Sequence, residues 1–137
     1  MNIKLTRPLI LDNTGLRIKL ELDFIKYYKW LVEKNYYNCI KTTCPKHGSH
    51  ISIVTKKLHG KNFDMNKLSK YHNLKVDFTY DNNIKIGGRL FTNFWLYVDF
   101  PMGHLIKKEL GIIEDNFLGF HITICNTKNE GTKYNLV

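Results

Sequence analysis

The 137-residue sequence has few of the features that mark secreted or membrane-spanning proteins. Its three cysteines are an odd number, which argues against a disulfide framework. No apolar run is long enough to span a bilayer, and residues 1–11 lack the continuous apolar stretch and cleavage site of a signal peptide. We therefore expect a cytoplasmic protein that does not enter a membrane, acting in the host cytoplasm if its source is viral.

Acidic residues are also scarce, because 12 Asp and Glu stand against 21 Lys and Arg, for a formal net charge of +9. No low-complexity block or long charge run indicates disorder, and a hydrophobic content of 43% suffices for a packed core. We expect residues 1–137 to form one domain. The charge favours anionic partners such as nucleotides or RNA, although lysines dispersed over a solvated surface would give the same total.

The hydrophobic pattern predicts several strands. Alternation of apolar and charged residues predicts strands over 3–11 and 16–22, with a turn at 13–15 between them. Pro8 predicts an edge position or an interruption in the first of these strands. Further strands are expected at 50–55, 74–78, 84–86, 90–100 and 120–126.

Three segments show helical spacing. A helix is predicted from Asp23, its expected N-cap, to about residue 35, and a short helix is expected after Asp64. A third is predicted to start at Pro101 and end before Gly111, with Leu105, Ile106 and Leu110 as its apolar face. The mixture of strands and helices predicts an α+β fold with antiparallel sheets and helices on their outer faces.

One short pattern occurs twice, as HISI at residues 50–53 and HITI at residues 121–124. In a strand, side chains at i and i+2 share a face, so each histidine would stand beside a hydroxyl with the isoleucines buried behind. Only two of the six histidines open this pattern. Two such matches would arise by chance in roughly one per cent of chains of typical composition.

Two such strands side by side would place two imidazoles and two hydroxyls around one cavity. Histidine, with a pKa near 6.5, gives or takes a proton close to neutral pH, and each transfer is typically worth about 10²–10⁴-fold in rate. One of His50 and His121 would act as base and the other as acid, and the sequence leaves the choice open. Ser52 and Thr123 would hydrogen-bond the non-bridging oxygens of a phosphodiester.

With both motifs complete and 71 residues apart, the sequence resembles the 2H phosphoesterase superfamily, which is named for two His-apolar-Ser/Thr-apolar motifs. The resemblance implies a duplicated bilobal fold in which antiparallel sheets line a central groove. It also implies a metal-independent phosphodiesterase, a hydrolase without cofactors, that acts on 2′,5′-linked or 2′,3′-cyclic phosphodiesters in RNA and nucleotides. Phage members of similar size degrade cyclic nucleotide signals of bacterial defence, and other small members act in RNA repair.

Between these substrates we expect a cyclic nucleotide signal, because a small chain has little room for an extended strand-binding surface. Frequent Asn, Lys, Ile and Tyr is typical of AT-rich genomes, which many viruses have, and is compatible with a phage source. The alternatives are a 2′,3′-cyclic phosphodiesterase acting on RNA ends and a non-catalytic basic module that binds RNA. Such a module would explain the charge but not the repeated motif.

A metal site is a competing interpretation of one motif. Cys39, Cys44, His47 and His50 form a C-x₄-C-x₂-H-x₂-H pattern that superficially resembles a zinc cluster. The spacing is not a standard one, and the cluster would consume His50. We therefore expect no metal, with Cys39 and Cys44 as small, partly buried residues.

Five residues are candidates for substrate binding. Lys56 and Lys128 lie just beyond the motif strands and could meet phosphates, as could Arg89 after two glycines. Trp95 and Tyr97 could offer a surface on which bases stack. Each also has an ordinary interpretation, as an exposed lysine, a turn arginine or a core-facing aromatic residue.

Overall fold

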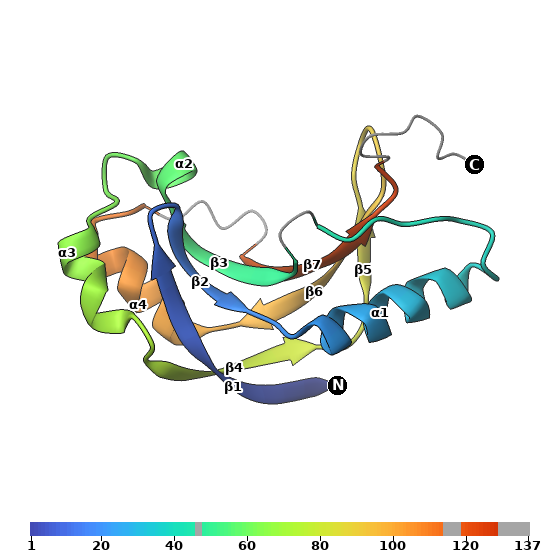
Figure 1. Ribbon diagram of the computed structural model, residues 1–137, viewed down its shortest axis with the longest axis horizontal. Helices are drawn as coiled ribbons and strands as arrows, with labels where there is room; N and C mark the ends of the chain where they lie inside the picture. Colours follow the sequence, from blue (N-terminus) through green and yellow to red (C-terminus); the bar gives the residue numbers. More distant parts are fainter. Residues whose placement is uncertain (46–47, 114–118, 129–137) are drawn as a thin grey trace.

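The computed structural model describes residues 1–45, 48–113 and 119–128. These residues form an α+β fold with a seven-stranded antiparallel sheet and four α-helices (Figure 1). The strands are β1 (Asn2–Asp12), β2 (Gly15–Lys19), β3 (His50–Thr55), β4 (Lys75–Asp81), β5 (Lys85–Gly87), β6 (Asn93–Asp99) and β7 (Phe120–Asn126). The helices are α1 (Leu22–Asn35), α2 (Lys56–His59), α3 (Met65–Leu68) and α4 (Pro101–Glu109), and a 3₁₀ turn, η1, covers Ser69–Tyr71.

The strand order is β3-β2-β1-β4-β6-β5, and β7 also pairs with β6. The long strand β1 joins the two halves of this order, because residues 2–8 pair with β4 and residues 9–12 pair with β2. Pro8 lies at this change of partner, where its missing N–H group interrupts the strand least. The strand continues through Pro8, so the predicted interruption is wrong. Pro8 pairs with Lys75 of β4 and has no partner in β2, so β1 is paired on one side only at this residue.

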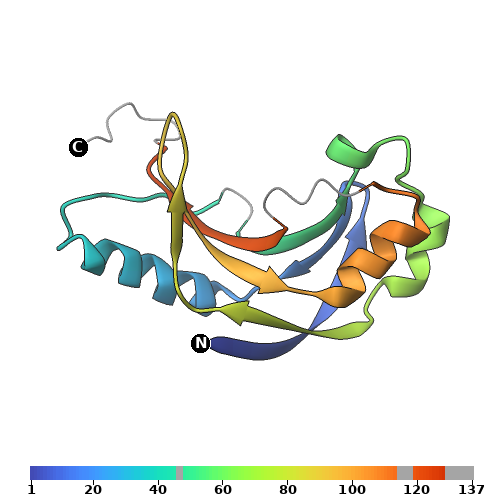
Figure 2. The same cartoon turned by 180° about the vertical axis from the view of Figure 1, so that it is seen from behind.

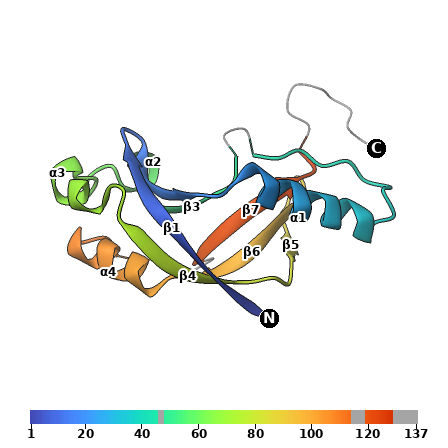
Figure 3. The same cartoon turned by 60° about the horizontal axis from the view of Figure 1, so that its bottom comes forward.

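The sheet is strongly curved, and the helices lie at its two ends. Figures 1 and 2 show α1 at one end and α3 and α4 at the other, with β3 and β7 close together between them. Figure 3 shows β1 running diagonally across the molecule to its hairpin with β2. The two motif strands, β3 and β7, therefore lie in the middle of the molecule, between the helices at its two ends (Figures 1 and 2). None of the helices within the described ranges is long and apolar enough to cross a membrane.

Two strand–helix–strand units share the same internal order. In the first, β2 leads through α1 to β3, and β3 pairs with β2; in the second, β6 leads through α4 to β7, and β7 pairs with β6. Each pairing contains a register shift at the corresponding place, between Leu16 and Arg17 in β2 and between Phe94 and Trp95 in β6. Each unit therefore presents its motif strand beside a partner strand in the same register.

Three local expectations were wrong. Leu22 belongs to α1, not to the preceding strand, and is 62% exposed. The N-cap of α1 is Glu21, without a side-chain cap bond, so the predicted capping role of Asp23 is wrong. Leu105 is 66% exposed and does not belong to the apolar face of α4.

The buried face of α4 contains a glycine, which explains the error at Leu105. Gly103 and Ile106 are buried, and a Cβ atom on Gly103 would lie only 2.5 Å from the Phe120 ring. The helix thus approaches β7 closely because Gly103 has no side chain. The spacing of apolar side chains cannot reveal such a face, because glycine has no side chain and does not contribute to the pattern.

Candidate active site

The two motif strands lie next to each other. The Ser49 hydroxyl, in a side chain that is only 3% exposed, donates a hydrogen bond to the Thr123 carbonyl oxygen at 2.5 Å. This bond joins the residue before the first motif to the second motif. The predicted alternation is confirmed, because the histidines and hydroxyls of the motifs are solvent-accessible while the isoleucines are not. The four motif isoleucines, Ile51, Ile53, Ile122 and Ile124, are at most 1% exposed.

Side chains from both motifs line one hollow of about 180 Å³, which we call the motif hollow. It contains all four residues predicted to be catalytic: His50, Ser52, His121 and Thr123. Its remaining lining residues are Pro45, Gly48, Ser49 and Asn126. The structure therefore brings together two imidazoles and two hydroxyls that the sequence separates by 71 residues.

Each imidazole is oriented by a carbonyl group two residues before it. His50 Nδ1 lies 3.3 Å from the Gly48 carbonyl oxygen, and His121 Nδ1 lies 3.4 Å from the Gly119 carbonyl oxygen. A carbonyl oxygen only accepts, so Nδ1 carries the proton in both rings. The neutral ring then keeps Nε2 as the free acceptor, the state required of a general base.

Both orienting residues are glycines in the left-handed region, with φ of +81° at Gly48 and +65° at Gly119. The repeat is therefore longer than the two histidine motifs, and reads Gly-x-His-Ile-Ser/Thr-Ile at residues 48–53 and 119–124. We did not predict these glycines from the sequence, although the extended repeat was visible in it. A glycine at one offset from both histidines was the signal that could have identified them.

Replacing either glycine with alanine is expected to disturb its imidazole as well as to lower stability, and so to impair any acid–base catalysis at this site. A side chain at positive φ costs about 1–2 kcal/mol, and relief of that strain would move the carbonyl away from Nδ1. Turnover by Gly48→Ala or Gly119→Ala should fall at least about tenfold, in line with other groups that orient a catalytic histidine. The pH profile of kcat/KM should change as well, and both can be measured by steady-state kinetics.

Gly111→Ala is the matched control for this prediction. Gly111 follows α4 with φ of +71°, and a Cβ there would meet only the Asn62 amide at 3.6 Å. The same backbone strain should lower stability by a similar amount without changing the pH profile. Equal kinetic effects at all three glycines would show that the carbonyls do not orient the imidazoles.

The partner strands place different side chains beside the two motifs. Arg17 and Lys19 of β2 pair with Ser52 and His50, whereas Trp95 and Tyr97 of β6 pair with Thr123 and His121. Directly opposite residues in antiparallel strands share a face, with Cβ atoms about 4.5–5.5 Å apart. One motif is thus flanked by cations and the other by aromatic rings. Arg17 and Lys19 were not among the predicted site residues.

The surroundings of His50 lower its pKa below the ordinary value of 6.5. Burial is the main cause, since it penalises the charged imidazolium, and the positive charge of Arg17 and the proximity of His121 and Lys19 act in the same direction. The Gly48 carbonyl opposes this shift. His50 is therefore neutral at pH 7, with Nε2 ready to accept a proton.

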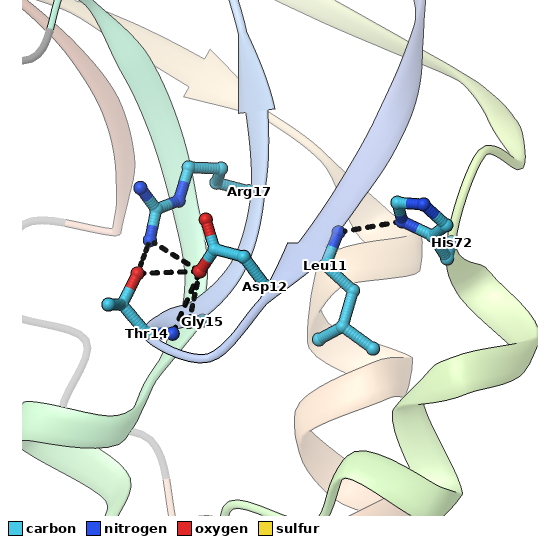
Figure 4. A network of polar contacts seen from close by, with 6 residues as sticks. All are labelled: Leu11, Asp12, Thr14, Gly15, Arg17 and His72. Atoms are coloured by element: carbon cyan, nitrogen blue, oxygen red, sulfur yellow. Dashed lines mark hydrogen bonds and ion pairs between the residues drawn. The ribbon is translucent and has the colours of Figure 1, made fainter.

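Arg17 is held in place by the turn between β1 and β2 (Figure 4). Its Nη2 lies 3.4 Å from an Asp12 carboxylate oxygen and donates to the Thr14 hydroxyl. The pKa of Asp12 is lowered, chiefly by the hydrogen bond from the Thr14 side chain, so the carboxylate stays charged at neutral pH. The arginine is thus fixed beside the motif strand, and part of its charge is neutralised.

A second hollow of about 460 Å³ adjoins the motif hollow and shares His121 and Thr123 with it. We call it the side hollow, and its other lining residues are Gly87, Gly88, Arg89, Asn93 and Trp95. The indole lies against the β5 backbone, since a Cβ on Gly87 would be 2.9 Å from the ring atom Cη2 of Trp95. The structure therefore places two predicted binding residues, Arg89 and Trp95, next to His121.

The other three predicted binding residues lie outside both hollows. Tyr97 is the closest, opposite His121 on β6 and 47% exposed. Lys56 begins α2, where its backbone N–H donates to the Thr14 carbonyl, and Lys128 Nζ lies 5.7 Å from the centre of the Phe91 ring. Substrate contacts by Lys56 and Lys128 stay predictions.

The zinc-like pattern is only partly described, because His47 lies outside the described residues. Cys39 is exposed and its thiol contacts the Tyr37 carbonyl, Cys44 is partly buried, and His50 lines the motif hollow. Within residues 1–45, 48–113 and 119–128, no three His, Cys, Asp or Glu side chains are grouped so that they could hold a metal ion.

The site can transfer protons at two positions and donate hydrogen bonds at two more. His50 and His121 supply the proton-transfer groups, and Ser52 and Thr123 supply the donors. These assignments rest on the chain's own geometry. Searches against protein-family models, curated proteins and solved structures gave no significant match.

Proposed function

We propose that this protein is a metal-independent phosphodiesterase of the 2H type, which cleaves nucleotide phosphodiester bonds by acid–base catalysis. The observation that carries the proposal is the motif hollow, which gathers both histidines and both motif hydroxyls within about 180 Å³. The two strand–helix–strand units, paired in the same register, support a duplicated bilobal domain with this hollow in its central groove.

The reaction needs only groups that line this hollow. An attacking oxygen, from water or a neighbouring ribose hydroxyl, gives its proton to one imidazole as its bond to phosphorus forms. The bond from phosphorus to the leaving oxygen breaks, and the second imidazole gives that oxygen a proton. Ser52 and Thr123 donate hydrogen bonds to the non-bridging oxygens, where negative charge accumulates in the transition state.

The electrostatic surroundings favour His50 as the base and His121 as the acid. Burial and the neighbouring cations lower the pKa of His50, so its neutral form dominates at pH 7. A base must be neutral before it acts. The Gly48 carbonyl accepts a hydrogen bond from Nδ1 of this ring, which leaves Nε2 to take the proton of the attacking oxygen.

The pH dependence of kcat/KM follows from this assignment and is expected to be bell-shaped. Activity should fall on the acidic side as His50 becomes protonated, and this limb should lie below pH 6.5 because the pKa of His50 is lowered from that value. The alkaline limb reports loss of the proton from the acid. An acidic limb above pH 6.5 would contradict His50 as the base.

Chelation tests the metal-free mechanism. Activity should persist in excess EDTA, because the two histidines perform both proton transfers. Added zinc should give no stimulation. Complete loss of activity in EDTA with recovery on addition of zinc would overturn the mechanism.

For the substrate, we propose a cyclic nucleotide signal of host defence, destroyed by a viral enzyme in the host cytoplasm. The side hollow supports a nucleotide of some kind, because Trp95 offers a surface on which a base can stack beside His121. A 2′,3′-cyclic phosphate on an RNA end would use the same chemistry and is the second candidate. Chromatography of both substrate classes after incubation separates the two.

A further inference from the structure

The two halves of the site are built alike but carry different chemistry. At the positions opposite the first motif, β2 supplies Arg17 and Lys19; at the positions opposite the second motif, β6 supplies Trp95 and Tyr97. Because the two strand pairs share one register, the same residue types could have stood opposite both motifs. A substrate in the motif hollow therefore lies between a strand that carries cations opposite the first motif and a strand that carries aromatic residues opposite the second.

The aromatic side has the properties of a nucleobase site. The side hollow adjoins the motif hollow through His121 and Thr123, and it combines the Trp95 indole with Arg89 and Asn93. Stacking on an aromatic ring holds any base, and guanidinium and amide groups offer hydrogen bonds to its edge. Gly87 leaves room for the indole at the wall of this hollow.

The cationic side has the properties of an anion site. Lys19 is exposed, pairs directly with His50, and forms no ion pair with a carboxylate within the described parts of the chain. Arg17 is already bound to Asp12 and is only 17% exposed, so it adds positive potential but less direct contact. Lys19 is thus the free cation nearest to His50 along β2.

We propose that the substrate is an oligonucleotide phosphodiester, linear or cyclic, with a nucleobase on Trp95 and a second phosphate on Lys19. The phosphodiester that is cleaved lies between them, in the motif hollow. This inference rests on the proposed function and narrows its substrate class. A nucleoside 2′,3′-cyclic monophosphate has one phosphate and leaves the Lys19 side empty, so it is a poorer substrate.

The experiment compares substrates that differ only in the second phosphate. Dinucleoside monophosphates of the linkage that the protein cleaves are assayed beside the same compounds with an added 5′- or 3′-terminal phosphate, at low ionic strength to limit screening. The added phosphate should raise kcat/KM about fivefold at one of the two ends, the size of a strong exposed charge pair. Lys19→Gln should bring this ratio close to one.

Two variants make the result specific. Lys75→Gln removes the same charge from an exposed strand lysine on β4, far along the sheet order from β3, and should keep the wild-type ratio. Trp95→Leu should raise KM for substrates with and without the added phosphate and leave their ratio intact. Tyr97 is not needed for either expectation.

Two outcomes overturn the inference. One is a wild-type ratio close to one with both terminal phosphates, and the other is an unchanged ratio in Lys19→Gln. Failure of the proposed function looks different, because no phosphodiester is then cleaved, or cleavage survives replacement of His50 and His121. The substrate inference and the reaction class are therefore tested by separate results.

Discussion

Replacement of His50 or His121 with alanine is expected to lower phosphodiester turnover by about 10²–10⁴-fold, because each variant loses one of the two proton transfers. The double variant should be little worse than either single variant, since the two groups act in one concerted process. Both side chains face a solvent-accessible hollow, so the fold should be preserved. Steady-state kinetics together with circular dichroism checks both expectations.

His72→Gln is the control for general effects of removing a histidine. His72 Nδ1 accepts a hydrogen bond from the Leu11 backbone N–H at 3.0 Å, next to the turn that holds Arg17 (Figure 4). Its replacement can affect stability but should leave turnover per folded molecule unchanged. Comparable losses at His72 and at the motif histidines would contradict an acid–base role for the motif pair.

Replacement of the motif isoleucine Ile122 with alanine is expected to lower stability rather than turnover, the reverse of the result expected for the motif histidines. Ile122 is fully buried, and removal of such a side chain typically lowers the free energy of unfolding by about 2–5 kcal/mol. The hydrophobic area is lost and a cavity remains in the core behind the site. Urea denaturation should show this loss as a lower midpoint with an unchanged slope.

Thr123→Val is the matched comparison for Ile122→Ala, because it alters the neighbouring residue on the other face of β7. Thr123 lines the motif hollow, so its hydroxyl should matter for turnover and little for unfolding. A loss of one transition-state donor typically costs about 10²–10³-fold. If Thr123→Val destabilised the fold as strongly as Ile122→Ala, the division of the motif into a buried and a reactive face would be wrong.

The motif strands were predictable because their signal is local. Alternation places His50 and Ser52 on one face and the isoleucines on the other, and the observed bounds of β3 match the predicted 50–55. Short-range signals also predicted the helix after Asp64, whose carboxylate accepts from the Asn66 and Lys67 backbone N–H groups. The α+β class follows from the same patterns.

The parts that could not be predicted depend on contacts between distant segments. Sequence spacing does not say that Lys19 pairs with His50 or that Trp95 pairs with Thr123, because the register depends on how the whole sheet assembles. The position of Gly103 against Phe120 is likewise a tertiary contact. The orienting role of Gly48 required the carbonyl direction, which only the backbone conformation gives.

The most direct test of the account is one assay in excess EDTA. Wild-type protein and the His50→Ala/His121→Ala variant are each incubated with a panel of cyclic di- and trinucleotides and RNA ends bearing 2′,3′-cyclic phosphate, and the products are separated by chromatography. We predict that the wild type opens at least one cyclic oligonucleotide and that the variant opens none. If the wild type leaves the whole panel intact, or if the variant cleaves as fast as the wild type, paired-histidine catalysis at this site is contradicted.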